Sequence, residues 1–197
     1  MMRALNVALL SFVCASAFAA DKKKTAAPAQ DQMAQAQAMM EKAAAPGAEH
    51  KLLAKLAGNW TTSAKMFWGP KPMEMNGSAE NKMMLGDRYL DEEFKGTFMG
   101  KPFEGHGWTG FDNVSKKFVA TWVDNMGTGI IFMEGTADGA GKTITFTGTE
   151  NDPMTGKSKT IREVMTIDSP TQHTDRFFEP GPDGKEMKTM EIVYTKK

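Results

Sequence analysis

The sequence predicts an all-β domain, a ten-stranded antiparallel up-and-down barrel with a short N-terminal helix that caps it. From Trp60 onward, apolar and polar residues alternate with a period of two in short runs, which is the pattern of half-buried strands. Turn residues such as Gly86-Asp87 and Pro182-Asp183-Gly184 separate these runs. No intervening segment is long enough for a parallel crossover, and closing a meander into a barrel removes both exposed edges.

Length and charge exclude several classes of protein. The chain has 197 residues, which suits one globular domain, and it carries 24 Lys and Arg residues against 24 Asp and Glu residues. This balance provides no basic field for phosphates, so we predict no nucleic-acid partner. The sequence also lacks a Gly-X-Ser-X-Gly motif, a phosphate loop and a dinucleotide fingerprint. We therefore predict no cofactor and no catalytic residue. A low-activity enzyme that uses one buried acid is an alternative that ranks below the two non-enzymatic functions considered at the end of this section.

Residues 1 to 19 have the pattern of a signal peptide. Arg3 is followed by a nearly apolar run over residues 4 to 15, and Ala17-Phe18-Ala19 supplies the small residues that signal peptidase reads. The run is shorter than the roughly 20 residues that span a bilayer, so we expect no stable membrane insertion after cleavage. Cleavage near Ala19 predicts a periplasmic or secreted protein. It would also remove Cys14, the single cysteine, and with it disulfides and cysteine-ligated zinc.

The segment before the barrel divides into two parts. Residues 20 to 48 are rich in Ala, Gln, Lys and Met and contain no aromatic residue, so they form either a disordered tether or a frayed helix. Residues 49 to 197 form the barrel domain. At its start, residues 49 to 58 are expected to form a short amphipathic helix with Leu52, Leu53 and Leu56 on one side and Gly58 as its stop signal.

The strands follow in order after Gly58. In the first strand, Trp60, Thr62, Ala64, Met66 and Trp68 share one face. The other nine strands are predicted near residues 73–84, 88–98, 103–111, 117–125, 128–137, 142–149, 158–168, 171–179 and 186–195.

Several motifs resemble known families. Gly58-Asn59-Trp60 at the start of the first strand resembles the Gly-X-Trp opening of the calycins, the group of lipocalins and fatty-acid-binding proteins. A fuller resemblance, over about residues 46 to 197, is to the bacterial family DUF1579, whose function is unknown. It is carried by His50-Lys51-Leu52-Leu53, Gly110-Phe111-Asp112, Lys116-Lys117-Phe118-Val119, Thr121-Trp122-Val123-Asp124-Asn125-Met126, Asp152-Pro153-Met154-Thr155-Gly156-Lys157, Pro180-Gly181-Pro182-Asp183-Gly184-Lys185-Glu186 and Met190-Glu191-Ile192-Val193-Tyr194.

This resemblance implies a lipocalin-like barrel and no established activity. In calycins an arginine near the end of the barrel often covers the Gly-X-Trp tryptophan. The resemblance therefore implies a cation–π role for Arg176 over Trp60.

The candidate ligand site is the barrel interior. We expect Trp60, Met66, Trp68, Phe94, Trp122 and Phe132 to line a cavity for a small, largely apolar molecule. Gly105 and Gly107 share one face of a strand and would leave room inside, although they could instead serve a bend. The main alternative is a filled barrel that acts as a structural or protein-interaction module, since aromatic stripes are also ordinary packing.

Two charged residues fall on apolar strand faces. Glu92 alternates with Leu90 and Phe94, and Glu163 alternates with Ile161 and Met165. Ionised groups seldom point into a core without a partner, so both are candidate inward carboxylates. Their expected partners are Arg162, Arg176 or the polar head of a ligand.

Metal sites have weaker support. Glu104 with His106, and His173 with Asp175, share strand faces, but two ligands do not make a site and surface histidines are common. The methionines are scattered rather than arrayed, which favours adaptable packing over copper binding. We therefore predict no metal.

Overall fold

A computed structural model describes residues 29–197 of the chain. The proposed signal peptide, the start of the tether and Cys14 lie outside the described residues. The chain divides into a unit that ends at Met39 and a compact unit, Met40–Lys197, which holds the barrel.

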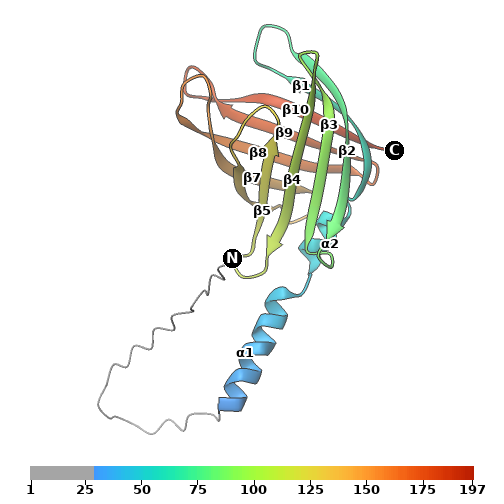
Figure 1. The fold of residues 1–197 in the computed structure, drawn as a ribbon, viewed down its shortest axis with the longest axis vertical. Coiled ribbons are helices and arrows are strands. Elements are labelled where there is room, and N and C mark those ends of the chain that lie inside the picture. Colours follow the sequence, from blue (N-terminus) through green and yellow to red (C-terminus); the bar gives the residue numbers. More distant parts are fainter. Residues whose placement is uncertain (1–28) are drawn as a thin grey trace, which may run out of the picture. The chain divides into compact units, whose positions relative to one another are not determined.

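The described residues form two helices and ten strands (Figure 1). Their bounds are α1 Ala29–Ala44, α2 Ala48–Ala54, β1 Gly58–Met66, β2 Met73–Met84, β3 Tyr89–Phe98, β4 Lys101–Asp112, β5 Lys117–Asp124, β6 Ile131–Ala137, β7 Thr143–Asn151, β8 Ser158–Ser169, β9 Gln172–Pro180 and β10 Glu186–Lys196. The predicted all-β fold class and strand order are confirmed.

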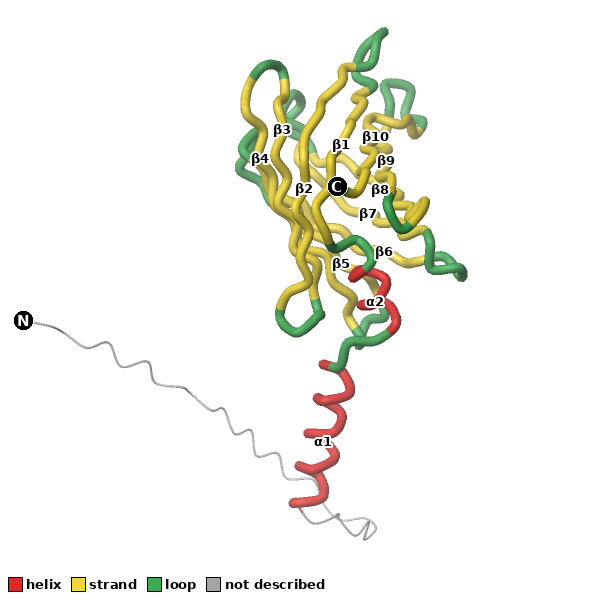
Figure 2. Tube along the Cα trace, turned by 90° about the vertical axis from the view of Figure 1, so that its right-hand side faces the viewer, coloured by secondary structure: helices red, strands yellow, loops and turns green. Residues whose placement is uncertain are grey.

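The strands close into a single barrel in simple meander order. Each strand pairs antiparallel with the next along the chain, and β1 closes the sheet by pairing with β10 from Trp60 opposite Lys196 to Met66 opposite Met190. Figure 2 shows the strands wrapping around a common interior. Because the pleat alternates, every second residue of each strand faces this interior.

Helix α1 contains part of the segment for which the sequence left two alternatives. Residues 29 to 44 are helical, in keeping with their Ala, Gln and Met content. Within the compact unit, the carbonyl groups of residues 43 to 45 accept hydrogen bonds from the side chains of Arg88 and Asn113 at 2.8 to 2.9 Å. The hairpins β2–β3 and β4–β5 thus cap carbonyls that the end of a helix leaves without partners.

Helix α2 closes one end of the barrel. Its Leu52 and Leu53, with Leu56 just beyond, pack against strand residues that include Phe111 and Phe118. Trp60 is 1% exposed, and its indole Nε1 donates a hydrogen bond to the carbonyl of Leu56 at 2.9 Å. One side chain therefore joins the helix to the first strand.

A lysine, and not the expected arginine, covers Trp60. The Nζ of Lys196 lies 5.3 Å from the Trp60 ring and donates to the carbonyl of Ala57 at 3.1 Å. The prediction for Arg176 was wrong, because Arg176 is on the outer face of β9 and pairs with Glu191 at 3.0 Å. A Cβ at Gly58, whose φ is +138°, would lie 2.8 Å from the Lys196 side chain, so this position requires glycine.

Two apolar clusters fill most of the interior. One combines α2 with side chains of β3 and β5 to β8, and the other combines β1, β2, β3 and β10 around Trp60 and Phe94. Gly105 and Gly107 do not leave empty space, because the Trp122 ring lies against both of them: a Cβ at Gly105 would be 2.2 Å from that ring. The expectation of room at these glycines was therefore wrong.

Replacing Trp60 by Ala should lower the free energy of unfolding by about 3 to 5 kcal/mol, because a large buried side chain and its hydrogen bond to the carbonyl of Leu56 are lost. Denaturant unfolding measures this change. Trp108→Ala is the matched control: Trp108 is 51% exposed on the outer face, and its loss should cost less than about 1 kcal/mol. An equally small loss of unfolding free energy for Trp60→Ala would contradict the burial of Trp60 at the closed end of the barrel.

Candidate functional site

The open half of the barrel has an accessible apolar inner wall. Met66 and Phe94 face inward and are buried, as expected. Around them, inward-facing side chains from several strands retain exposed surface even though they point into a closed barrel; these are Phe98, Phe103, Trp122, Phe177 and Met190. These partly exposed side chains lie toward the end of the barrel opposite α2.

Two residues expected in the interior lie elsewhere. Trp68 follows the end of β1, is 60% exposed, and contacts Phe98 edge-to-face at 6.0 Å between ring centroids, which places it at the rim of the open end. Phe132 is 52% exposed on the outer face of β6. Its assignment to the interior was wrong because Ile131 and Met133, the residues on either side of it, are the inward ones.

Three carboxyl groups face the interior at mid-depth. Glu92 on β3 and Glu163 on β8 point inward, as the alternation predicted, and Asp175 on β9 joins them. Asp175 is 4% exposed and Glu163 is also buried. The expected partners do not reach them: Arg162 pairs with Glu186 at 2.6 Å and Arg176 with Glu191, both outside the barrel.

Burial and mutual repulsion shift the ionisation of these groups to higher pH. Removal from water is the main cause that raises the pKa of Glu92 to about 7 and that of Glu163 to about 8. The charge of Glu92 further raises the pKa of Glu163. Burial, with Glu163 and Glu92 nearby, raises the pKa of Asp175 well above its usual value. The three carboxyls therefore act as one coupled cluster.

An aromatic column connects this cluster to the closed end. Tyr194 Oη donates a hydrogen bond to Glu92 Oε1 at 3.0 Å. The ring of His173 stacks on Tyr194 at 4.1 Å and meets Trp60 edge-to-face at 4.6 Å. Burial lowers the pKa of His173 to about 4, so this imidazole is neutral at pH 7. His173 is thus a buried residue, and the expectation that it lies on the surface was wrong.

Several buried polar atoms around the cluster have no hydrogen-bond partner within residues 29–197. They are Thr62 Oγ1, Asn81 Oδ1, His173 Nδ1 and Asp175 Oδ1. Asn81 lies directly across from Glu92 in the β2–β3 ladder, and Thr62 across from Tyr194 in the β1–β10 ladder. An unsatisfied buried polar atom costs about 1 to 3 kcal/mol, so a hydrogen bond to any of these four atoms would be stabilising.

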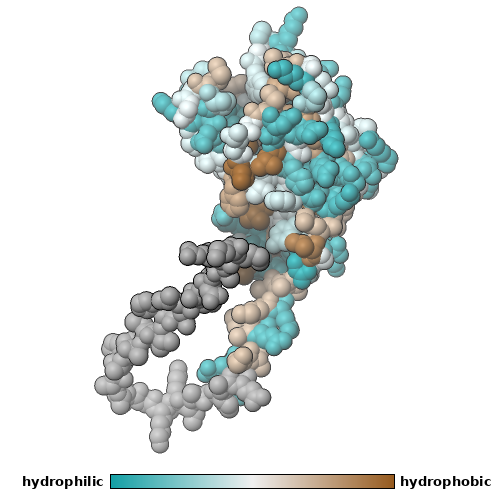
Figure 3. Space-filling model, viewed as in Figure 1, coloured by the Kyte–Doolittle hydropathy of each residue, from teal (hydrophilic) through white to brown (hydrophobic). Residues whose placement is uncertain are grey.

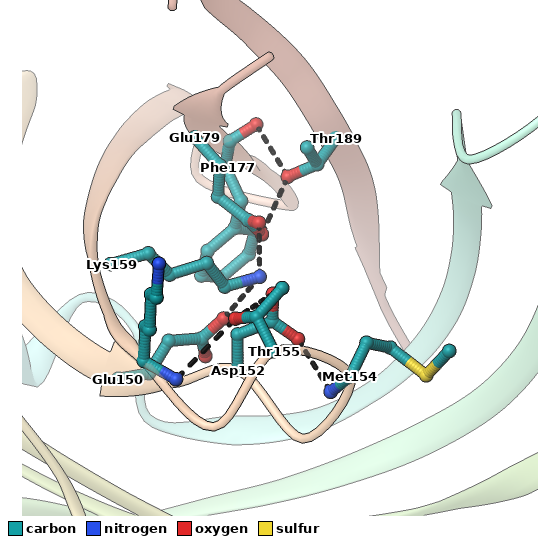
Figure 4. A network of polar contacts seen from close by, with 9 residues as sticks. Glu150, Asp152, Met154, Thr155, Lys159, Phe177, Glu179 and Thr189 are labelled. Atoms are coloured by element: carbon teal, nitrogen blue, oxygen red, sulfur yellow. Dashed lines mark hydrogen bonds and ion pairs between the residues drawn. The ribbon is translucent and has the colours of Figure 1, made fainter. Parts of the chain in front are cut away.

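A second polar network lies at the open rim, on strands β7 to β10 (Figure 4). Lys159 bridges Glu150, at 2.9 Å, and Glu179. Thr189 donates to Glu179 Oε1 at 3.1 Å, which ties the irregular part of β10 to β9. Unlike the cluster at mid-depth, these carboxylates have a cation between them.

The pairs considered as metal ligands are separated by the sheet. His106 is on the outer face of β4 and contacts Asp91 at 2.5 Å, whereas His173 and Asp175 face the interior. Among residues 29–197, no three His, Cys, Asp or Glu side chains are arranged to hold a metal ion.

Sequence reasoning missed Asp175, Asn81 and Tyr194 as parts of the site. Asp175 carried a signal, since it alternates with His173 and Phe177 along one strand face. Asn81 and Tyr194 carried none, because their role depends on which strands meet across the barrel.

The fold defines a calycin-like barrel: a closed antiparallel meander with a helix over one end and a partly exposed apolar inner wall toward the other. The chain belongs to the family described as protein of unknown function (DUF1579), whose model matches residues 45–196.

Several solved structures are similar to this chain. The protein Rv2717c from M. tuberculosis has a TM-score of 0.58 and 15% sequence identity, and the alignment covers 78% of this chain and 99% of that one. A de novo designed fluorescence-activating β-barrel has a TM-score of 0.42 and 16% identity, with 74% and 96% covered. A redesigned barrel, mFAP0 bound to DFHBI, has a TM-score of 0.39 and 18% identity, with 72% and 99% covered.

No curated protein matches the sequence. Within the described part of the chain, neither helix has the length and apolar character needed to cross a membrane.

Above about pH 6.5, unfolding stability should fall as the pH rises. Glu92 and Glu163 titrate near 7 and 8 when folded but near 4.5 when unfolded, so the native state holds more protons and loses this advantage as the pH passes through its pKa values. His173 has the opposite sign, but its contribution is complete above its unfolded pKa of 6.5.

Glu163→Gln, which mimics the protonated acid, should therefore be more stable than the native protein at about pH 8.5 and should gain less at about pH 6.5. Chemical denaturation at both values measures the difference. Glu93→Gln, on the outer face of the same strand as Glu92, should show no such pH dependence. Equal destabilisation by Glu163→Gln at both values would show that Glu163 is ionised in the folded protein.

Proposed function

We propose that this protein binds a small molecule with a largely apolar body inside its barrel. The observation that carries the proposal is the accessible inner wall of the open half, where Phe103, Trp122 and Phe177 face inward and still expose surface. Ligand sites in barrels of this size are concave and mostly apolar, with a few polar groups that fix orientation. Here the polar groups are those around Glu92.

Access to this wall comes from one side. Helix α2 and Trp60 occupy the closed end, so a ligand would enter between the hairpins of the other end, past Trp68 and the network around Lys159. Trp68 is a large exposed aromatic side chain at this rim, and Phe98 beneath it belongs to the inner wall. Together they offer continuous apolar contact from the rim inward.

A protein-interaction module is the second candidate function, and one observation favours it. Trp108 and Phe132 lie on either side of Thr121 on the outer face of β4 to β6, with exposed Val123 and Ile130 nearby. Figure 3 shows hydrophobic residues on the surface over the β5 side of the barrel. Exposed apolar patches of this kind mark contact surfaces more often than ordinary surface does.

A neutral naphthalene dye, N-phenyl-1-naphthylamine, distinguishes the two functions. If the inner wall is a ligand site, the dye should bind saturably with one-to-one stoichiometry, and its emission should rise. Calorimetry should give a negative heat-capacity change, which is the mark of apolar burial.

Met190→Trp should lower dye affinity by about tenfold or more, because the larger side chain occupies the inner wall. Met154→Trp is the same substitution at a 90% exposed position and should leave the affinity unchanged. If the dye does not bind the native protein, or if both variants behave alike, the interior is not the ligand site and the interaction module takes its place.

We also propose that the protein is exported, on the evidence of Arg3, the apolar run over residues 4 to 15 and Ala17-Phe18-Ala19. Intact mass measurement of the protein from its own host should give a chain that starts at Ala20, recovered from the periplasm or the medium. A chain that retains Met1 in the cytoplasm would contradict this.

A further inference from the structure

The three carboxyl groups at mid-depth are not matched by basic side chains in the part of the chain that the structure describes. None of the ion pairs formed within residues 29–197 includes Glu92, Glu163 or Asp175. The other charged or titratable groups that act on them are Tyr194 on the inside, and Asp168, Arg176 and His106 on the strands around them. Of these, Arg176 and His106 are engaged by Glu191 and Asp91 on the outer face.

Of the four buried atoms without a partner in residues 29–197, three are oxygens and the fourth is His173 Nδ1. Asn81 Oδ1 and Asp175 Oδ1 are oxygen acceptors, each on a side chain less than a tenth exposed, and Thr62 Oγ1 can also accept. Asn81 belongs to β2 and is independent of the acids, yet it lies across from Glu92 in the ladder. A group that satisfies these atoms must donate hydrogen bonds in several directions at once.

We infer that the interior binds a primary amine, whose ammonium group lies among Glu92, Glu163 and Asp175 while its apolar body contacts the inner wall. The inference rests on the proposed function and names the chemical class of the ligand. An ammonium group has three donors and no acceptor, so it can donate to the unpartnered oxygens and pair with a carboxyl group that loses its proton when the amine binds. The carboxylate of a fatty acid has no hydrogen to donate to Asn81 Oδ1, and an ionised member of the cluster would repel it.

The site is reachable from the inner wall. Glu92 faces inward and keeps more exposed surface than Glu163 or Asp175, which are 7% and 4% exposed. Glu92 is therefore the member of the cluster that an amine can reach most easily. Tyr194 Oη holds one oxygen of Glu92 by a hydrogen bond.

Amine binding should release protons. A carboxyl that is protonated in the free protein must give its proton to the buffer before it can pair with an ammonium group as a carboxylate. The heat of binding then includes the ionisation heat of the buffer, so it differs between phosphate and Tris at the same pH.

The test compares n-octylamine with n-octanol, which has the same length and no charge, by titration calorimetry on the full chain near pH 7.5. Octylamine should bind about tenfold more tightly or better, as expected for a charge-assisted hydrogen bond inside a protein. Its apparent enthalpy should change with the buffer, and that of octanol should not.

Glu163→Gln and Asp175→Asn should each remove most of the preference for octylamine over octanol, and Glu93→Gln on the outer face should keep it. The buffer dependence is measured on the native protein, so the test does not depend on any variant folding.

If octanol or the neutral naphthalene dye binds and octylamine has no advantage and no buffer dependence, the amine inference is wrong and the proposed function stands. If none of the three binds, the proposed function is wrong and the inference falls with it.

Discussion

Closure of the barrel is the constraint on which the rest of the structure depends. The pairing of β1 with β10 satisfies the last free edge, and from then on every second side chain of ten strands must share one interior. Helix α2 and Trp60 fill one end of it. A polar side chain on an inward position therefore either forms a hydrogen bond within the barrel or stays without a partner. Tyr194 and Glu92 form such a hydrogen bond. Asn81 Oδ1 and Asp175 Oδ1 have no hydrogen-bond partner within residues 29–197.

The buried acids lower the stability of the barrel, and we interpret them as part of a binding site. Two apolar clusters hold the barrel together, and Glu163 and Asp175 are buried acids in the same interior. These acids lie buried without a cation, and burial keeps them largely protonated at neutral pH. A protein that only needed a packed core would gain stability by replacing them. Their presence on inward strand positions is what points to a ligand.

The fold could be predicted from local pattern, because strand period and turn residues are local properties. The strand from 73 to 84 was predicted with its observed bounds, and Glu92 and Glu163 were assigned to the inward face. Phe132 was misassigned because the predicted strand began before Ile131, where β6 starts. An error of one residue in the start of a strand assigns its inward side chains to the outer face and its outward side chains to the interior.

Partners across the barrel could not be predicted in the same way. Lys196 rather than Arg176 covers Trp60, Trp122 fills the space at Gly105, and Asp175 joins Glu163 from the neighbouring strand. Each of these contacts depends on the register of closure, which no single segment encodes.

The central claim is that burial raises the pKa of the acids inside the barrel to neutral values or above. Carbon-13 NMR of the side-chain carboxyl groups, assigned through Glu92→Gln and Glu163→Gln, measures this directly as a titration of the free protein. We expect midpoints near 7 for Glu92 and near 8 for Glu163, well above the ordinary value of 4.5. Midpoints near 4.5 for both would show ionised, hydrated carboxylates and would contradict the described interior.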